Sequence, residues 1–481
     1  MNTELTELSL IQLNDCHAYL NSHPELFWEE GGVIRHEECG GLSRILTIVE
    51  QERKLNKNCL FLDNGDTLHG TFPVIQSKGE LIVPILNKLT LEAMTMHWEF
   101  FYGPERTKEL TNQLNYPALA CNIYDQKTNQ LIYEPYLIKN YPGVSVGIIG
   151  LASNIVDKTM PASFSEGIYF TSGEKELPVL IKELRSKKVD LILLLSHVGF
   201  PQEMQLIKEN PDLDICFSGH THHRLQKPVI SGKTIVIQSG CHGSFLGRLR
   251  LKIKNGKIIS HEHELIKVSA EIMPDQELQA MIDSALEPFS ELDQIVGQTK
   301  TDLNRNEMLS TTMDDFMLKA ATDATGIAIA FSNGWRYGAP IPAGPITMGA
   351  LTNIVPMNPP VSKVTLSGQE IWDMLEENLE RTFSADPFAQ MGGYLKRARG
   401  ITVTFKIENP KDTRIQEIFV GSEPIELDRS YEAAFVTDQG VGPEYGTNRQ
   451  QTEVRVFDAM LDLLAKGPYD GLEQPETFIL I

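Results

Sequence analysis

The sequence lacks the features that define several classes of protein. It has no run of about 18 consecutive apolar residues, so we expect no membrane-spanning helix. Its formal net charge is −21 and its lysines and arginines form no cluster, which argues against nucleic acid as a partner. It has no internal repeat and no low-complexity segment. These absences leave a soluble globular protein with an acidic surface.

Paired cysteine motifs and export signals are also missing. The six cysteines are scattered and form no CxxC pair, as is usual in a reducing compartment: Cys16, Cys39, Cys59, Cys121, Cys216 and Cys241. The first residues, "MNTELTELSL", are acidic and contain no basic segment followed by an apolar core. We therefore predict a cytoplasmic protein without a signal peptide, although a precursor trimmed earlier would give the same sequence.

A chain of 481 residues exceeds a typical single core, so we expect at least two domains. The segment "MPDQELQAMIDSALEPF" has apolar residues at helical spacing. We place a linker helix at residues 271–299, between a first domain at 1–270 and a second α/β domain at 300–481.

Several short apolar runs end in polar or glycine-rich turns. They are "LSLIQL" (8–13), "CLFL" (59–62), "VSVGIIGL" (144–151), "VDLILLL" (189–195) and "LDICF" (213–217). Such apolar runs suit strands that are covered on both faces, as in sheets packed under helices. Ligands bind at strand ends in such sheets. The first domain is therefore predicted to be α/β with its chemistry at the strand ends.

The segment "GHTHH" (219–223) places three of the chain's twelve histidines at one such end. Imidazole is the commonest metal ligand, but a solvated loop is the alternative for these residues alone. The other strand ends add further candidate ligands. Together they are Asp15, His17, Asp66, His97, His197, His220 and His222.

These seven side chains offer oxygen and nitrogen without sulfur, which suits divalent Mn, Fe or Zn. Seven ligands are too many for one tetrahedral ion and suit two ions that share a carboxylate. Singly, each residue has another explanation, such as Asp66 capping a turn or His97 lying in the core.

The order of these motifs resembles the calcineurin-like metallophosphoesterases, and more narrowly the 5′-nucleotidase family. "NDCHAYL", "DNGDTLHG", "EFFYG", "SHVG" and "SGHTHH" carry the resemblance in the first 250 residues, and "FSNGWRYG", "AGPITMG" and "LSGQEIWDML" carry it in the second region. The resemblance implies a four-layer αββα sandwich followed by a smaller α/β substrate-binding domain.

The resemblance also implies residue roles. One ion would be held by Asp15, His17, Asp66 and His222, and the other by Asp66, His97, His197 and His220. The shared carboxylate, Asp66, would be the central catalytic residue, and a hydroxide bridging the ions would attack the substrate. His223 matches no family role and is expected in a supporting or surface position.

The third motif departs from the family pattern. Matching on Glu-Phe-x-Tyr-Gly places His97 at a metal-binding asparagine, Trp98 at a histidine that stabilises the transition state, and Phe101 at the aspartate that orients that histidine. Trp98 cannot act as a proton shuttle near neutral pH. His-Trp-Glu-Phe and "ADPFAQMGG" are similar to the thiosulfohydrolase (SoxB) branch of the family.

In the second domain, Asn333, Gly334 and Arg336 match a substrate-binding turn of the family, where Arg336 would bind an anionic group. The stretch Pro356–Pro359 carries Met357 where family nucleotidases have a base-stacking phenylalanine. Phe388 is either a second aromatic side chain that packs against the substrate or a core residue.

These observations favour a hydrolase that uses two divalent ions on phosphate esters of nucleotides or related small molecules. The alternatives are SoxB-like hydrolysis of a sulfur-linked ester, a phosphodiesterase, and a non-catalytic anion-binding protein that keeps the metals. The expected partner is a small anionic substrate, with neither nucleic acid nor membrane. The thiol of Cys16 is expected to point away from the metals, because alternate residues of a strand face opposite sides.

Overall fold

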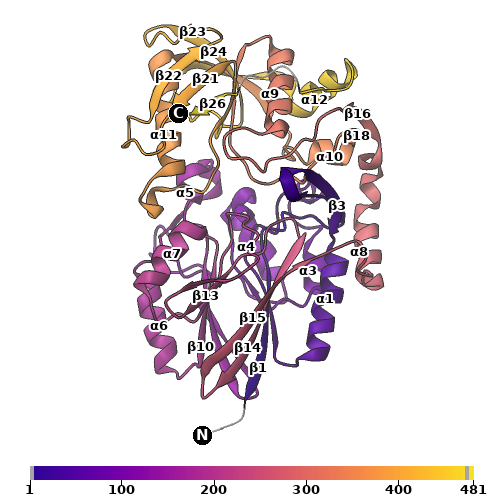
Figure 1. Cartoon of the computed structure of the whole chain (residues 1–481), viewed down its shortest axis with the longest axis vertical. Coiled ribbons are helices and arrows are strands. Elements are labelled where there is room, and N and C mark those ends of the chain that lie inside the picture. The colour runs from indigo at the N-terminus through magenta and orange to yellow at the C-terminus, as the bar shows by residue number, and fades with distance from the viewer. Residues whose placement is uncertain (1–4, 472–475) are drawn as a thin grey trace. The chain divides into compact units, whose positions relative to one another are not determined.

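The computed structural model describes residues 5–471 and 476–481; residues 1–4 of the acidic N-terminal segment lie outside it. The chain divides into two compact units, Met1–Pro288 and Phe289–Ile481 (Figure 1). The predicted linker, 271–299, contains the helix α8 (Gln276–Leu286) but ends in the strand β16 (Ile295–Thr299), which pairs with β18 (Gly344–Thr347) in the second unit.

Two sheets form the centre of the first unit. One has the order β15-β14-β1-β4-β5, with β1 Thr6–Leu13, β4 Cys59–Asp63, β5 Ala93–Met94, β14 Phe245–Lys254 and β15 Lys257–Lys267. The other has the order β12-β13-β11-β10-β8-β7, with β7 Tyr136–Tyr141, β8 Val144–Leu151, β10 Leu191–Ser196, β11 Ile215–Phe217, β12 Val229–Ser231 and β13 Thr234–Ile237. The five predicted apolar runs form β1, β4, β8, β10 and β11.

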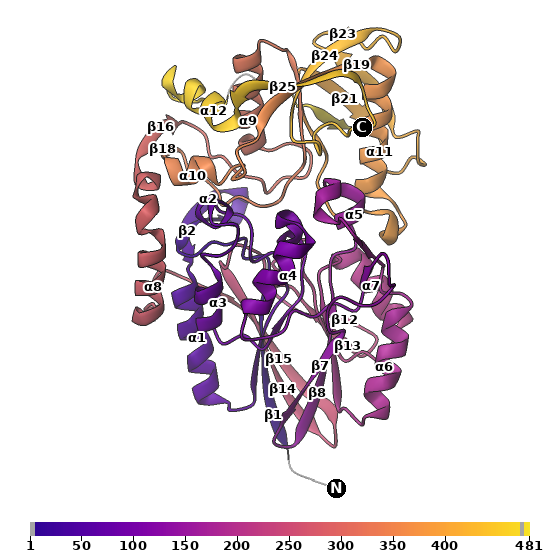
Figure 2. The same ribbon diagram turned by 180° about the vertical axis from the view of Figure 1, so that it is seen from behind.

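Helices cover the outer faces of these sheets. α1 (Leu42–Leu55) and α8 lie on one side, and α6 (Glu176–Ser186) and α7 (Phe200–Glu209) on the other (Figures 1 and 2). Fully buried side chains fill the space between the sheets, among them Leu10, Leu62, Leu193 and Phe217. The predicted four-layer sandwich is thus confirmed, and its strands are apolar because both faces are covered.

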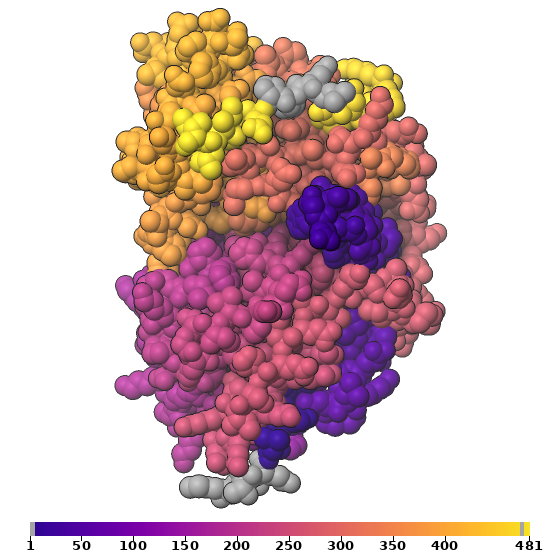
Figure 3. Space-filling model, in the orientation of Figure 1, coloured from indigo at the N-terminus to yellow at the C-terminus, as the bar shows by residue number. Residues whose placement is uncertain are grey.

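The first unit also contains shorter elements: α2 Phe72–Gln76, α3 Val83–Lys88, α4 Pro104–Gln113, α5 Val156–Thr159, the strand pair β6 (Ile123–Asp125) and β9 (Ile168–Phe170), and the hairpin of β2 (Ser22–Trp28) and β3 (Ile34–Gly40). Figure 3 shows the hairpin at the surface. Arg224 anchors it, with Nη2 donating to Glu25 and Nη1 donating to the carbonyl of Leu26, both at 2.6 Å.

The second unit is also α/β, as predicted. One sheet has the order β20-β17-β24-β19-β25, with β17 Ile329–Ser332, β19 Pro360–Ser367, β20 Arg397–Arg399, β24 Ser430–Val436 and β25 Thr447–Arg455. The other has the order β23-β22-β21-β26, with β21 Ile401–Phe405, β22 Ile415–Val420, β23 Glu423–Pro424 and β26 Phe478–Leu480. The helices are α9 Thr312–Thr325, α10 Met348–Thr352, α11 Gly368–Phe383 and α12 Val456–Ala465.

Within the described ranges, no helix is both long enough and apolar enough to cross a membrane.

Candidate metal centre

The predicted ligands follow the carboxyl ends of parallel strands in both sheets. β1 pairs in parallel with β4, and β10 pairs in parallel with β11. Five of the ligands have left-handed backbone conformations: Asp15 (φ 50°), His17 (46°), Asp66 (57°), His220 (70°) and His222 (56°). Residues other than glycine seldom adopt positive φ, and such strain concentrates at functional sites. Sharp turns, rather than extended strands, thus aim these side chains.

This local geometry corrects the reasoning about Cys16. The strand β1 ends at Leu13, and both neighbours of Cys16 have positive φ, so strand alternation does not set the direction of its thiol. Cys16 is fully buried. Burial, and next the charge of Asp63, raise the pKa of the thiol, so the side chain is held as a neutral thiol.

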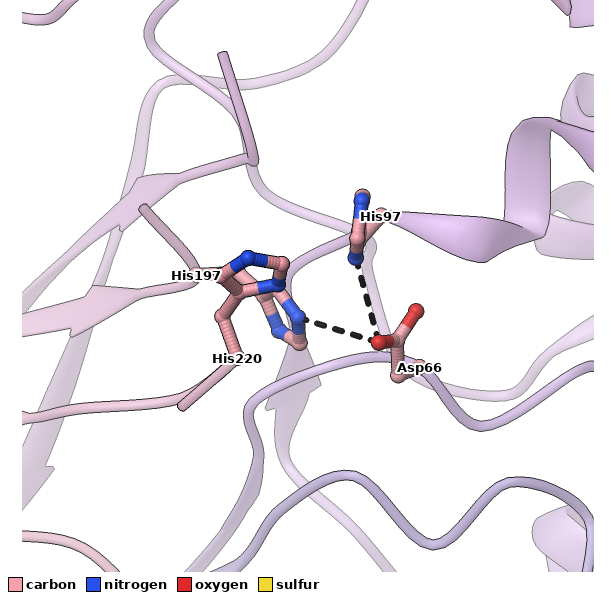
Figure 4. Close-up of side chains that lie close together, drawn as sticks. All are labelled: Asp66, His97, His197 and His220. Carbon is pink, nitrogen blue, oxygen red and sulfur yellow. Dashed lines mark hydrogen bonds and ion pairs between the residues drawn. The ribbon is translucent and has the colours of Figure 1, made fainter. Parts of the chain in front are cut away.

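Four of the predicted ligands meet in one group, which we call group B (Figure 4). Ligand atoms of Asp66, His97, His197 and His220 all lie within 4.8 Å of one another. Oδ2 of Asp66 is 3.1 Å from Nδ1 of His97 and 3.3 Å from Nε2 of His197. The four residues are buried, so a cation among them would be largely shielded from bulk water.

The other three predicted ligands form a second group, group A. Ligand atoms of Asp15, His17 and His222 lie within 4.8 Å of one another. The Nε2 atoms of His17 and His222 are 3.2 Å apart, and Nε2 of His222 is 3.3 Å from Oδ1 of Asp15. Two imidazole nitrogens and a carboxylate oxygen therefore converge on one point.

Asp66 connects the two groups. Its Oδ2 atom, which faces His97 and His197, is also 3.8 Å from Nε2 of His17 in group A. Its other oxygen, Oδ1, accepts a 2.7 Å hydrogen bond from the backbone N–H of Trp98. Burial alone would raise the pKa of Asp66, but the neighbouring imidazoles outweigh burial and hold the pKa well below its usual value.

The donor set fits divalent cations. Nδ1 of His197 lies 2.6 Å from the backbone carbonyl of Asn64, so in the neutral ring Nδ1 carries the proton and Nε2 carries the lone pair. That lone pair faces two carboxylates, at 3.4 Å from Asp15 and 3.3 Å from Asp66. A cation or a proton must lie between such groups to make the contact favourable. Burial lowers the pKa of His197, but the charges of Asp15 and Asp66 outweigh it and raise the pKa to about 10.

An aromatic wall adjoins group B. The ring of His97 contacts that of Trp98, and Trp98 stacks on His69. Phe101 contacts both His69 and Phe164. The two positions that would hold the family's histidine and aspartate therefore belong to a packed apolar cluster.

Sequence reasoning missed two further histidines, one that contacts group A and one that packs behind it. His242 follows β13 in the same way that the ligands follow their strands, a signal that could have identified it, and its ring contacts those of His17 and His222. His23 lies in the surface hairpin and contacts His242. His223, by contrast, is exposed and packs against Phe200, in keeping with the surface position expected for it.

The predicted substrate residues lie in the second unit. Gly334 passes so close to a neighbouring segment that a Cβ atom there would lie 2.2 Å from the carbonyl oxygen of Leu395, so only glycine fits. Arg336 is half-buried, with its guanidinium carbon 4.7 Å from the ring centroid of Tyr394, a contact that the sequence did not indicate. Asn333 and Phe388 are half-buried, so Phe388 is not a fully buried core residue.

Two family models match the chain. The calcineurin-like phosphoesterase model matches residues 8–224, and the 5′-nucleotidase C-terminal domain model matches residues 293–437. Similar curated proteins include the 5′-nucleotidases of Vibrio parahaemolyticus and Homo sapiens, each 24% identical; they align with 86% and 88% of this chain and 81% of their own lengths. The trifunctional nucleotide phosphoesterase YfkN of Bacillus subtilis is 23% identical over 91% of this chain, which spans 32% of that protein.

Solved structures show the same fold. The sulfate thiohydrolase SoxB of Thermus thermophilus superposes with a TM-score of 0.90 at 24% identity, covering 98% of this chain and 96% of that one. A 5′-nucleotidase precursor from Thermus thermophilus superposes with a TM-score of 0.86 at 22% identity, covering 99% of each chain. The fold is thus common to relatives with different substrates and does not choose between them.

Proposed function

Because the chain belongs to the calcineurin-like phosphoesterases that carry a 5′-nucleotidase C-terminal domain, and is a metal-dependent hydrolase of phosphoester bonds, we propose that it uses two divalent ions on a small anionic ester. The observation that carries this proposal is the position of Asp66, whose Oδ2 atom faces imidazoles of both ligand groups. Mn, Zn and Fe suit the oxygen and nitrogen donors.

Two bound ions of this kind lower the pKa of water and neutralise charge that develops on the reacting group. The chain's own residues preorganise the site for that chemistry. The backbone N–H of Trp98 orients Asp66, and the carbonyl of Asn64 fixes the tautomer of His197. In the second unit, Arg336 is the residue to which the family resemblance assigns binding of an anionic group.

The aromatic wall supports a substrate whose leaving group needs no proton from the protein. Trp98 and Phe101 offer no proton donor of the kind that a histidine–aspartate pair provides. Among phosphate compounds, aryl esters and phosphoanhydrides meet this condition. A sulfur-linked ester with a thiolate leaving group meets it as well, and the motif His97-Trp98-Glu99-Phe100 favours this second candidate.

An aryl phosphate assay in the presence of Mn²⁺ tests the proposal. Wild-type protein should release the phenolate, and Asp66→Asn should abolish turnover, since this change replaces the carboxylate shared by both groups with a neutral amide. Asp458→Asn is the matched control because Asp458 is exposed on α12, and it should turn over like wild type. Equal rates for Asp66→Asn and wild type would contradict the proposal.

A substrate panel then separates the two candidates. Nucleoside monophosphates, sugar phosphates, dinucleotides and thiosulfonates should be compared at equal enzyme and metal concentrations. Preferred cleavage of a phosphate ester supports the phosphoesterase, and preferred cleavage of a thiosulfonate supports the SoxB-like reaction. Absence of turnover on all of them would contradict both candidates.

A further inference from the structure

His242 packs beside the ligand pair of group A without belonging to either ligand group. Its ring centroid lies 5.8 Å from that of His17 and 6.1 Å from that of His222. The rings of His17 and His222 are themselves 5.1 Å apart. The three imidazoles therefore form one cluster at group A.

The backbone of His242 is held firmly in this place. Its N–H donates a 2.7 Å hydrogen bond to the carbonyl of Asp15, another member of group A. Its own carbonyl lies 3.0 Å from Nε2 of His23, which comes from the surface hairpin. Its φ of 57° is left-handed, a conformation that a histidine adopts only where the surroundings impose it.

The ring of His242 is also enclosed by the fold. The residue is only 3% exposed, so its packing against the pair of group A is shielded from solvent and the ring has little room to turn away.

We propose that His242 is a positioning residue that holds the rings of His17 and His222 ready for the ion of group A. Two neutral imidazoles whose lone pairs must converge on one point need packing that fixes their side-chain torsions before the ion arrives. The contacts of His242 with this pair provide it. The rings of group B pack on one another, with centroids 4.7 Å apart for His97 and His220 and 5.0 Å apart for His97 and His197. The effect should thus fall on one ion.

The inference rests on the proposed two-ion centre, and Mn²⁺ binding by equilibrium dialysis tests both separately. Wild-type protein should bind two ions; fewer would contradict the proposed function itself. His242→Gly removes the ring while allowing φ of 57°. It should lower the affinity for one ion by about 10- to 100-fold and leave the affinity for the other unchanged. His263→Ala, at a half-buried histidine on β15, is the matched control and should bind both ions like wild type.

Double variants identify the affected ion. His242→Gly combined with His220→Ala should bind neither ion tightly, because each change disables a different group. His242→Gly combined with His222→Ala should keep the ion of group B. An equal loss of affinity for both ions in the single variant would indicate general destabilisation and overturn the inference. Wild-type affinity for both ions would overturn it as well. If His242→Gly does not fold, His242→Asn, which tolerates left-handed φ, gives the same test with the same outcomes.

Discussion

The imidazole of His69 stacks on the indole of Trp98, with ring centroids 5.0 Å apart and planes inclined by 24°. Because it packs against Trp98, the position of the missing family histidine, His69 is the first candidate for a replacement proton donor. Burial lowers its pKa to about 3, so the ring is neutral at physiological pH and is a poor acid. Neither the indole of Trp98 nor the neutral imidazole of His69 is a good acid. The residues beside group B therefore support a leaving group that departs without taking a proton from the protein.

The rate of hydrolysis should therefore depend steeply on the pKa of the leaving group. General acid catalysis is worth about 10²–10⁴-fold, and its absence affects alkoxides far more than aryl oxides or thiolates. A series of phosphate monoesters measures this dependence, and ordinary nucleoside monophosphates should be cleaved slowly. The triple variant His97→Asn, Trp98→His, Phe101→Asp should flatten the series. A flat wild-type series would mean that another residue, such as exposed His223, donates the proton.

Gly70 should be essential for the ion of group A. A Cβ atom at this position would lie 2.3 Å from the carbonyl oxygen of His17, so Gly70→Ala must displace the backbone of a predicted ligand. We expect a loss of at least about tenfold in affinity for one Mn²⁺ ion. Gly167, like Gly70, has positive φ, but a Cβ atom added there would have no neighbouring atom within 4 Å, so Gly167→Ala controls for backbone strain alone. Similar Mn²⁺ affinities in the two variants would refute the explanation by crowding.

Cys16 should contribute through its backbone and not through sulfur. The ligands are oxygen and nitrogen, and the buried thiol is held neutral rather than as the thiolate that binds metals. Cys16→Ser should keep both the metal content and the rate on an aryl phosphate. Elemental analysis and the assay check this, and loss of either property would show that the thiol takes part.

Metal-free protein should lose stability as pH rises from about 6.5 to about 10. The pKa of His197 is raised from 6.5 in the unfolded chain to about 10 in the fold. The stabilisation from its protonation is therefore complete below the unfolded value and disappears as pH passes through the folded value. Thermal unfolding in EDTA measures the trend, and His197→Gln, which cannot take up the proton, should show a shallower fall. Identical slopes would contradict this assignment.

Much of the site could be predicted because its signals are local in the sequence. An apolar run that ends in Asp-x-His or Gly-His-x-His marks both a strand and its ligands. The order of these motifs, which resembles that of the family, assigns the ligands to two groups. The left-handed turns at Asp15 and His220 could not be predicted this way, since they depend on packing between strands. His23 and His242 are 219 residues apart and come together only in the folded sandwich. Tyr394 meets Arg336 in the second unit for the same reason.

Counting the ions in purified protein tests the central claim most directly. After loading with Mn²⁺ and removal of the excess, elemental analysis of wild-type protein should give two ions per chain. His220→Ala and His222→Ala should each give about one, because the first disables group B and the second disables group A. One ion or none in fully loaded wild-type protein would contradict the two-metal account.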